Sequence, residues 1–121
     1  MKKSILLLPV FLFVLQCNSP KPVENSAHQT ELSIKNQVEN GAFVVDVRTP
    51  EEFAEGSVAG AVNIPLDEVE SRVEEFRNKP SVVVFCKTGN RSGQAKEILE
   101  KNGVKSVTNG INVKTMEKEM K

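Results

Sequence analysis

The sequence predicts an α/β domain in which a doubly wound parallel sheet carries helices on both of its faces. Short apolar runs alternate with helix-like segments along the chain, and this order of elements is typical of a parallel sheet. The apolar runs do not alternate between polar and apolar residues, as expected for strands that are covered on both faces. The length of 121 residues leaves room for one domain.

The domain is expected to begin with a helix over residues 30–39, which the Asn40-Gly41 pair ends in the manner of a C-cap. The apolar run at residues 42–47 predicts the first strand. The segment Thr49-Pro50-Glu51-Glu52 then opens a short helix. Its threonine can cap the helix, its proline fits the first helical position, and its last glutamate completes a capping box.

The middle of the chain is expected to contribute two more strands and one helix. Residues 61–63 predict a short strand that Pro65 closes, and residues 81–85 form the clearest buried strand of the chain. Between these strands, Asp67 is expected to cap an amphipathic helix. The apolar residues of this helix follow helical spacing: Leu66, Val69, Val73 and Phe76.

The last part of the chain is expected to add a helix, a strand and a second helix. Residues 92–101 predict the first helix, which an Asn-Gly pair at residues 102–103 ends. Residues 104–108 suit a last strand. A terminal amphipathic helix is indicated by Val113, Met116 and Met120, whose methionines are expected to pack in the core.

Residues 1–17 predict an export signal, which is excluded from the fold. Lys2 and Lys3 precede an almost unbroken apolar run at residues 5–15, and a basic start followed by a short apolar stretch is typical of a secretory signal. The run is shorter than the roughly 20 apolar residues that a permanent membrane helix needs. The alternative is a buried N-terminal helix.

Cys17 lies where this apolar run ends, and the polar segment Asn18-Ser19-Pro20 follows it. This arrangement resembles a bacterial lipoprotein signal, in which the cysteine is acylated and becomes the mature N-terminus. The alternative is a plain signal peptide that is cleaved nearby, because Gln16 stands where a small residue is usual. We expect an exported, periplasmic or cell-envelope protein that a lipid on Cys17 anchors to the membrane.

A linker is expected at residues 18–28 and the domain at residues 29–121, because the linker contains prolines and shows no apolar periodicity. His28, the only histidine, is expected to be solvated in this linker. The chain carries 16 basic and 16 acidic residues. This balance indicates no polyanionic partner and disfavours nucleic acid.

The candidate site follows the buried strand at residues 81–85, where Cys86 opens a polar loop and a helix starts near Arg91. Ligands of open parallel sheets bind beyond the carboxyl ends of the strands. Loop amides and a helix N-terminus favour a negative charge there. Gly89 lets the loop curl with a positive φ angle, and the Arg91 guanidinium can fork onto an anionic substrate.

These features are expected to lower the thiol pKa of Cys86 from about 8.5 into the range of roughly 3.5–7.5. The expected domain contains no histidine, which excludes a Cys–His dyad and papain-like proteolysis. No residues have the spacing of a zinc or iron site, so we expect no metal. Taken alone, a cysteine at a strand end is also compatible with an inert buried residue.

Five segments resemble, in order, the motifs of the rhodanese homology domain, over residues 30–111. They are Asp46-Val47-Arg48, Glu52-Phe53, Gly56, residues 60–65 and residues 86–92. The resemblance implies a doubly wound α/β fold and a sulfurtransferase that forms a persulfide on Cys86. Its partners would be a small anionic sulfur donor such as thiosulfate and a thiol or cyanide acceptor.

The resemblance also implies which residues cradle the persulfide and the anionic end of the donor. They are Lys87, Thr88, Gly89, Asn90 and Arg91. We expect a monomer that needs no cofactor.

The length of the loop favours sulfur transfer over a related phosphatase activity. Four residues lie between Cys86 and Arg91, whereas the related cell-cycle phosphatases carry one residue more. Two other functions stay open. One is a catalytically weak rhodanese-like binding module that carries a persulfide or presents a surface to a partner. The other is structural, with a disulfide between Cys86 and Cys17, which acylation of Cys17 would prevent.

Three positions depart from the family pattern. Ser57-Val58 replaces His-Ile, Asn109-Gly110 replaces Gly-Gly, and Lys114 lies near the place of a common tryptophan. We expect the first departure to alter only surface hydrogen bonding. A turn at Asn109 is expected to survive, because asparagine tolerates a positive φ angle. None of the three is expected to touch the Cys86 loop.

Other polar residues near the site are expected to be structural. Asp46 is expected to bond backbone amides, and Arg48 to pair with a nearby carboxylate. Lys87 either steers the substrate or is solvated. Shaping the loop or capping the helix is the expected role of Thr88, Asn90 and Ser92.

Overall fold

The computed structural model describes residues 32–121. The predicted export signal with Cys17, the linker at residues 18–28 with His28, and residues 29–31 of the expected domain lie outside the described residues. The boundaries predicted for these parts therefore stay predictions.

A parallel sheet forms the centre of the fold, with its strands in the order β2-β1-β3-β4. The strands are β1 (Phe43–Asp46), β2 (Val62–Asn63), β3 (Val82–Cys86) and β4 (Val107–Asn112). Every residue of β3 is buried, as the unbroken apolar run predicts. The register pairs Asp46 with Phe85, so the segments that follow β1 and β3 leave the sheet side by side.

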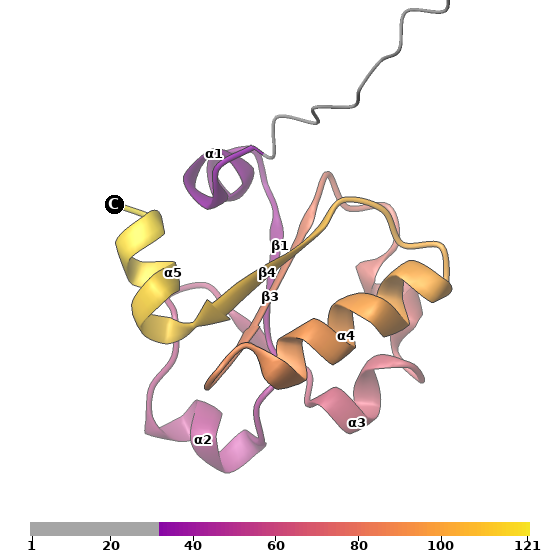
Figure 1. Cartoon of the computed structure of the whole chain (residues 1–121), viewed down its shortest axis with the longest axis horizontal. Helices are drawn as coiled ribbons and strands as arrows, with labels where there is room; N and C mark the ends of the chain where they lie inside the picture. Colours follow the sequence, from indigo (N-terminus) through magenta and orange to yellow (C-terminus); the bar gives the residue numbers. More distant parts are fainter. Residues whose placement is uncertain (1–31) are drawn as a thin grey trace, which may run out of the picture.

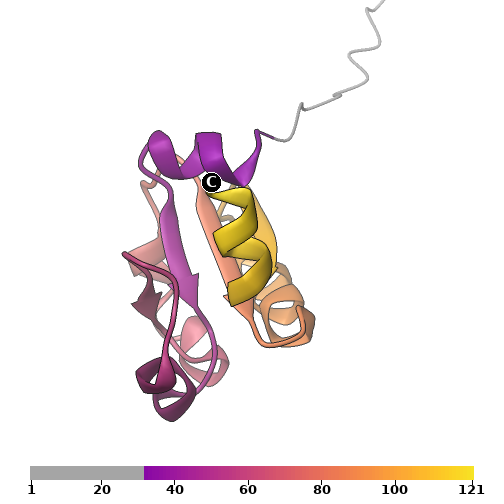
Figure 2. The ribbon, with the colours of Figure 1, turned by 90° about the vertical axis from the view of Figure 1, so that its left-hand side faces the viewer.

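Helices cover both faces of this sheet (Figures 1 and 2). One face carries α1 (Ile34–Glu39) and α5 (Val113–Glu119), and the other carries α3 (Leu66–Val69) and α4 (Asn90–Lys101). Val83 and Phe85 of β3 pack in a hydrophobic cluster with Met116 of α5, whereas Val84 packs in a second cluster with Leu99 of α4. Successive strand residues thus serve opposite faces, and the predicted doubly wound fold is confirmed.

Helix α2 (Pro50–Glu55) lies beyond the carboxyl end of β1 (Figure 1). The Thr49 hydroxyl accepts a hydrogen bond from the Glu52 N–H at 3.2 Å, and the Glu52 carboxylate accepts one from the Thr49 N–H at 3.4 Å. The predicted capping box is confirmed. It also fixes the side chain of Glu52 at the start of the helix.

The predicted helix through Leu66 and Phe76 is interrupted, so this prediction was wrong. The structure divides the segment into α3 and a 3₁₀ helix, η1 (Val73–Phe76). The chain leaves helical geometry at Arg72, which has φ −112° and ψ 21°. Because a 3₁₀ turn still returns to the same side every three residues, Phe76 remains buried although the helix is broken.

The predicted cap of this helix was also wrong. Pro65 stands at the N-cap position of α3, and no side chain caps the helix. The Leu66 N–H donates to the Val47 carbonyl at 3.0 Å, which ties the first helical residue to the end of β1. Asp67 consequently lies inside the first turn, where a carboxylate still interacts favourably with the helix dipole.

Other boundaries also differ from those predicted: β1, β2 and β3 by one residue at an end, and α1, α4 and β4 by more. Within the described part of the chain, α1 begins at Ile34, after the side chain of Ser33 accepts a hydrogen bond at the N-cap. Helix α4 begins at Asn90, and β4 begins at Val107 instead of residue 104. The Val104 N–H bonds back to the end of α4 and Ser106 turns with φ +58°, so the strand starts only afterwards.

No helix between residues 32 and 121 has the length and apolarity needed to cross a membrane.

Candidate active site

Cys86 is the last residue of β3 and is fully buried. The loop after it turns back at once, because Gly89 has φ +91° and α4 begins at Asn90. A side chain at position 89 would be strained in this conformation, and its Cβ would lie 3.2 Å from Ile111 Cγ2. The predicted positive φ angle of Gly89 is confirmed.

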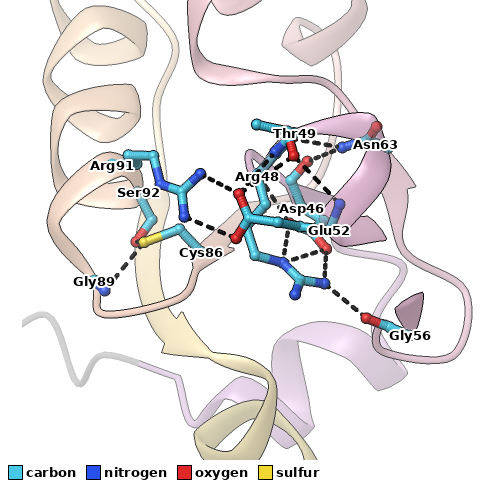
Figure 3. A network of polar contacts seen from close by, with 10 residues as sticks. All are labelled: Asp46, Arg48, Thr49, Glu52, Gly56, Asn63, Cys86, Gly89, Arg91 and Ser92. Atoms are coloured by element: carbon cyan, nitrogen blue, oxygen red, sulfur yellow. Dashed lines mark hydrogen bonds and ion pairs between the residues drawn. The ribbon is translucent and has the colours of Figure 1, made fainter. Parts of the chain in front are cut away.

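At close range, the Cys86 sulfur accepts hydrogen bonds from two groups (Figure 3). They are the Gly89 N–H at 3.0 Å and the Ser92 hydroxyl at 3.3 Å. Burial raises the pKa of the Cys86 thiol, but hydrogen bonds from the Ser92 hydroxyl and from the N–H groups of Ser92, Thr88 and Gly89 outweigh burial. The net pKa is lowered, in the direction that the sequence predicts, and the donors are groups of the loop and of the first turn of α4.

The Arg91 guanidinium is engaged by a carboxylate from another element (Figure 3). Its two terminal nitrogens lie 2.7 and 3.0 Å from the two carboxylate oxygens of Glu52 in α2. The hydrogen bonds from Arg91 are the main reason why the pKa of Glu52 falls from 4.5 to about 2. That Arg91 binds the sulfur donor stays a prediction. In the structure, the partner of the Arg91 guanidinium is Glu52.

Asp46 and Arg48 form a second ion pair close by (Figure 3). Asp46 is fully buried and accepts hydrogen bonds from the Arg48 backbone N–H at 3.0 Å and from the guanidinium at 2.6 to 3.0 Å. Arg48 also donates to the Gly56 carbonyl at 2.8 Å. The predicted structural roles of both residues are confirmed, since the pair joins the end of β1 to the end of α2.

Of the remaining predicted cradle residues, Thr88 interacts with the Cys86 sulfur through its backbone N–H. The side chains of Lys87, Thr88 and Asn90 are exposed. The Asn90 side chain accepts a hydrogen bond from Gln94 at 3.1 Å, within the first turn of α4. The loop therefore presents the N–H groups of Thr88 and Gly89 to the sulfur. Lys87 is exposed, and whether it steers the donor or is solvated stays open.

Two departures from the family pattern reach the site, contrary to expectation. The Asn109 side chain donates to the Gly89 carbonyl at 3.0 Å and lies 2.7 Å from the Ser92 hydroxyl, so it does touch the Cys86 loop. The Ser57 hydroxyl donates to buried Asp46 at 2.8 Å, so its hydrogen bond is not at the surface. In the sequence, only the unusual residues at these two positions could have indicated the contacts. Each contact joins residues that lie far apart along the chain.

A cavity of about 430 Å³ adjoins the loop and is lined by Arg91 but not by Cys86. Its other walls come from the segments after β1 and β2 and from α4: Val47, Thr49, Pro65, Leu66, Asp67, Glu70 and Ile98. Within residues 32–121, no group of three or more His, Cys, Asp or Glu side chains is placed to hold a metal ion.

Comparison with known proteins relates this chain to one protein family. A family model described as Rhodanese-like domain matches residues 30–113. The thiosulfate sulfurtransferase PspE of Escherichia coli is 43% identical over 72 residues, which cover 58% of this chain and 69% of that protein. The solved structure of a rhodanese with anions from E. coli is 41% identical, with a TM-score of 0.57, over 61% of this chain and 89% of that one.

Some relatives are longer than the shared region. The uncharacterized protein YqhL of Bacillus subtilis is 41% identical over 68 residues, which cover 56% of this chain. This chain spans only 54% of the length of YqhL. The similarity therefore concerns the domain and not the whole of each relative.

Proposed function

The chain belongs to the rhodanese-like domain family, and we propose that it is a sulfurtransferase that carries sulfane sulfur as a persulfide on Cys86. The observation that carries this proposal is the short loop in which the Gly89 N–H and the Ser92 hydroxyl both point at the Cys86 sulfur. A thiolate held in this way is a nucleophile that needs no neighbouring base. Its donor would be a small anion such as thiosulfate.

The proposed reaction has two displacements at sulfur. The Cys86 thiolate attacks the outer sulfur of thiosulfate, a new S–S bond forms, the S–S bond of thiosulfate breaks, and sulfite leaves with the bonding electron pair. Cys86 then carries a persulfide anion. A cyanide ion or a thiolate attacks the terminal sulfur, which releases thiocyanate or a new persulfide and returns the Cys86 thiolate. No external oxidant or reductant enters this sequence.

The described residues would have two roles, since some would stabilise the reacting sulfur and others would bind the negatively charged donor. The N–H groups of the loop and the Ser92 hydroxyl would stabilise the thiolate before attack and the departing thiolate afterwards. Lys87 at the rim would attract the anionic donor. Arg91 would bind the donor only in exchange for Glu52, since that carboxylate occupies both of its terminal nitrogens at rest.

The test is a steady-state assay of thiocyanate formation from thiosulfate and cyanide. The full chain is expected to follow a ping-pong course, and Cys86→Ser is expected to abolish turnover while the circular dichroism spectrum stays unchanged. A matched control is Ser81→Ala, just before the opposite end of the same strand, which is expected to retain turnover. Equal turnover in Cys86→Ser and in the unaltered chain would contradict the assignment.

We propose in addition that the protein is exported and anchored to a membrane by a lipid on Cys17. The support is the basic start, the short apolar run and the cysteine that ends it. Intact-mass measurement of the protein from its native host tests this proposal. An acylated N-terminal Cys17 is expected; an unmodified N-terminus beyond Cys17 would contradict lipidation, and a retained Met1 would contradict export as well.

A persulfide-carrying module without efficient turnover is the second candidate function. The observation that favours it is the bidentate pair of Arg91 with Glu52, which leaves fewer unpaired positive charges near Cys86 for a small anion. A carrier would accept sulfur from a partner's persulfide at least as readily as from thiosulfate. Loading of Cys86 by a persulfide donor but not by excess thiosulfate would favour the carrier over the thiosulfate-using enzyme.

A further inference from the structure

Asn109 connects two residues that donate hydrogen bonds to the Cys86 sulfur, Gly89 and Ser92. Its Nδ2 donates to the Gly89 carbonyl at 3.0 Å, and its Oδ1 accepts from the Ser92 hydroxyl at 2.7 Å. Oδ1 also accepts from the Ile111 backbone N–H at 3.0 Å. Asn109 lies on β4, whereas Gly89 and Ser92 lie at the start of α4, so it braces the loop from the neighbouring strand.

The Ser92 hydroxyl faces two acceptors but owns one hydrogen. Its oxygen lies 2.7 Å from Asn109 Oδ1 and 3.3 Å from the Cys86 sulfur. Ser92 is fully buried. Bulk water therefore cannot donate a hydrogen bond to the acceptor that does not receive the Ser92 hydrogen. The hydrogen therefore has two alternative positions, one toward the Cys86 sulfur and one toward Asn109 Oδ1.

We propose that Asn109 is a positioning residue that draws the Ser92 hydroxyl hydrogen away from Cys86 whenever the Cys86 sulfur carries no charge. In the thiol state the S–H donates to the Ser92 oxygen, and the Ser92 hydroxyl donates to Asn109. In the thiolate state the Ser92 hydroxyl turns to the sulfur, because a charged acceptor makes the stronger bond. Asn109 then keeps its bond from Ile111.

The consequence for sulfur transfer rests on the proposed persulfide chemistry. When Cys86 is loaded, the negative charge lies on the terminal sulfur and the inner sulfur becomes a weak acceptor. The Ser92 hydrogen is then expected to return to Asn109. Asn109 thus stabilises the thiol and the loaded state relative to the free thiolate, which favours a protein that holds sulfur until an acceptor arrives.

The charged groups around Cys86 do not change when Asn109 is replaced by an uncharged residue. They are Arg91 of α4 paired with Glu52 of α2, Asp46 and Arg48 at the end of β1, and Lys87 in the loop. A shift in the titration of Cys86 on such a replacement is therefore attributable to the hydrogen bonds and not to a lost charge.

The test is the pH profile of Cys86 alkylation, followed by mass spectrometry of the Cys86 peptide in the full chain. Asn109→Ala frees the Ser92 hydroxyl for the thiolate and is expected to lower the midpoint by about half to one pH unit. Asn109→Gly removes the same acceptor and serves as the second variant. Asn109→Asp places a charged acceptor there and is expected to raise the midpoint. This measurement uses no sulfur donor, so its outcome is independent of whether the protein turns over thiosulfate.

Two controls separate this proposal from a simple loosening of the loop. Thr108→Ala, one residue earlier on β4 and bonded to Gln37, is expected to leave the midpoint unchanged. In a Ser92→Ala background, Asn109→Ala is expected to have no effect, because the hydrogen that it redirects is gone. A raised midpoint for both Asn109→Ala and Asn109→Gly, or the same shift with and without Ser92, would overturn the proposal.

Discussion

Replacing Glu52 by glutamine removes one charge from the ion pair with Arg91 and keeps the shape of the side chain. The carboxylate binds both terminal nitrogens of Arg91 at 2.7 and 3.0 Å, whereas an amide offers one acceptor. The glutamine oxygen can still accept the Thr49 N–H, so the capping box and α2 are expected to persist. The variant therefore tests the ion pair and not the helix.

The expected loss of stability is about 0.5–1 kcal/mol at neutral pH, at the upper end of the range for partly exposed pairs because the contact is bidentate. The pKa of Glu52 is about 2 in the folded protein, below its ordinary value of 4.5. A depressed pKa stabilises the fold above the ordinary value, and this contribution is lost as the pH falls through the folded value. The stability difference between the two proteins is thus expected to disappear between pH 4.5 and about 2.

The same variant is expected to lower the KM for thiosulfate, because Arg91 no longer has to leave a carboxylate to meet the donor. A gain of about 1 kcal/mol corresponds to a roughly fivefold lower KM. The kcat is expected to change little, since Glu52 makes no hydrogen bond to the Cys86 sulfur. Steady-state thiocyanate assays measure both constants, and Glu55→Gln on the same helix controls for the change in net charge. An unchanged or higher KM in Glu52→Gln alone would refute the view that Glu52 competes with the donor.

Three further predictions concern the fold around the site and are measured by urea denaturation. Gly110→Ala is expected to destabilise the protein by about 1–3 kcal/mol through overpacking, because a Cβ there would collide with Met116 Sδ and lie 3.1 Å from Val83 Cγ1; an unchanged midpoint would show that the core yields. Ile111 has φ +69°, so Ile111→Gly is expected to stabilise the protein by about 1 kcal/mol through relief of strain, and a loss of stability would contradict this. Asp46→Asn leaves the Arg48 guanidinium without its buried charged partner and is expected to lower the stability by about 3 kcal/mol. A loss below about 0.5 kcal/mol, as is usual for exposed ion pairs, would contradict this prediction.

The sequence predicted those parts of the fold and of the site whose chemistry is local. The capping box at Thr49 and Glu52 and the positive φ angle of Gly89 each depend on residues within a few positions of one another. The buried strand that ends at Cys86 is marked by its own composition. Such features depend on residues that are close together in the sequence, so they can be predicted without knowledge of the tertiary structure.

The parts that could not be predicted depend on contacts between distant segments. Arg91 and Glu52 are 39 residues apart, and their pairing requires that the segments after β1 and β3 leave the sheet side by side. Asn109 meets Ser92 only because β4 lies beside β3. The break at Arg72 was missed because a 3₁₀ turn preserves the apolar spacing that indicates a helix.

The most direct test of the central claim is the intact mass of the protein after incubation with thiosulfate and removal of the excess donor. The unaltered chain is expected to gain the mass of one sulfur atom, and cyanide is expected to remove it with release of one equivalent of thiocyanate. Cys86→Ser is expected to gain nothing. The same gain in Cys86→Ser, or thiocyanate formation by the unaltered chain without any gain, would contradict a persulfide on Cys86.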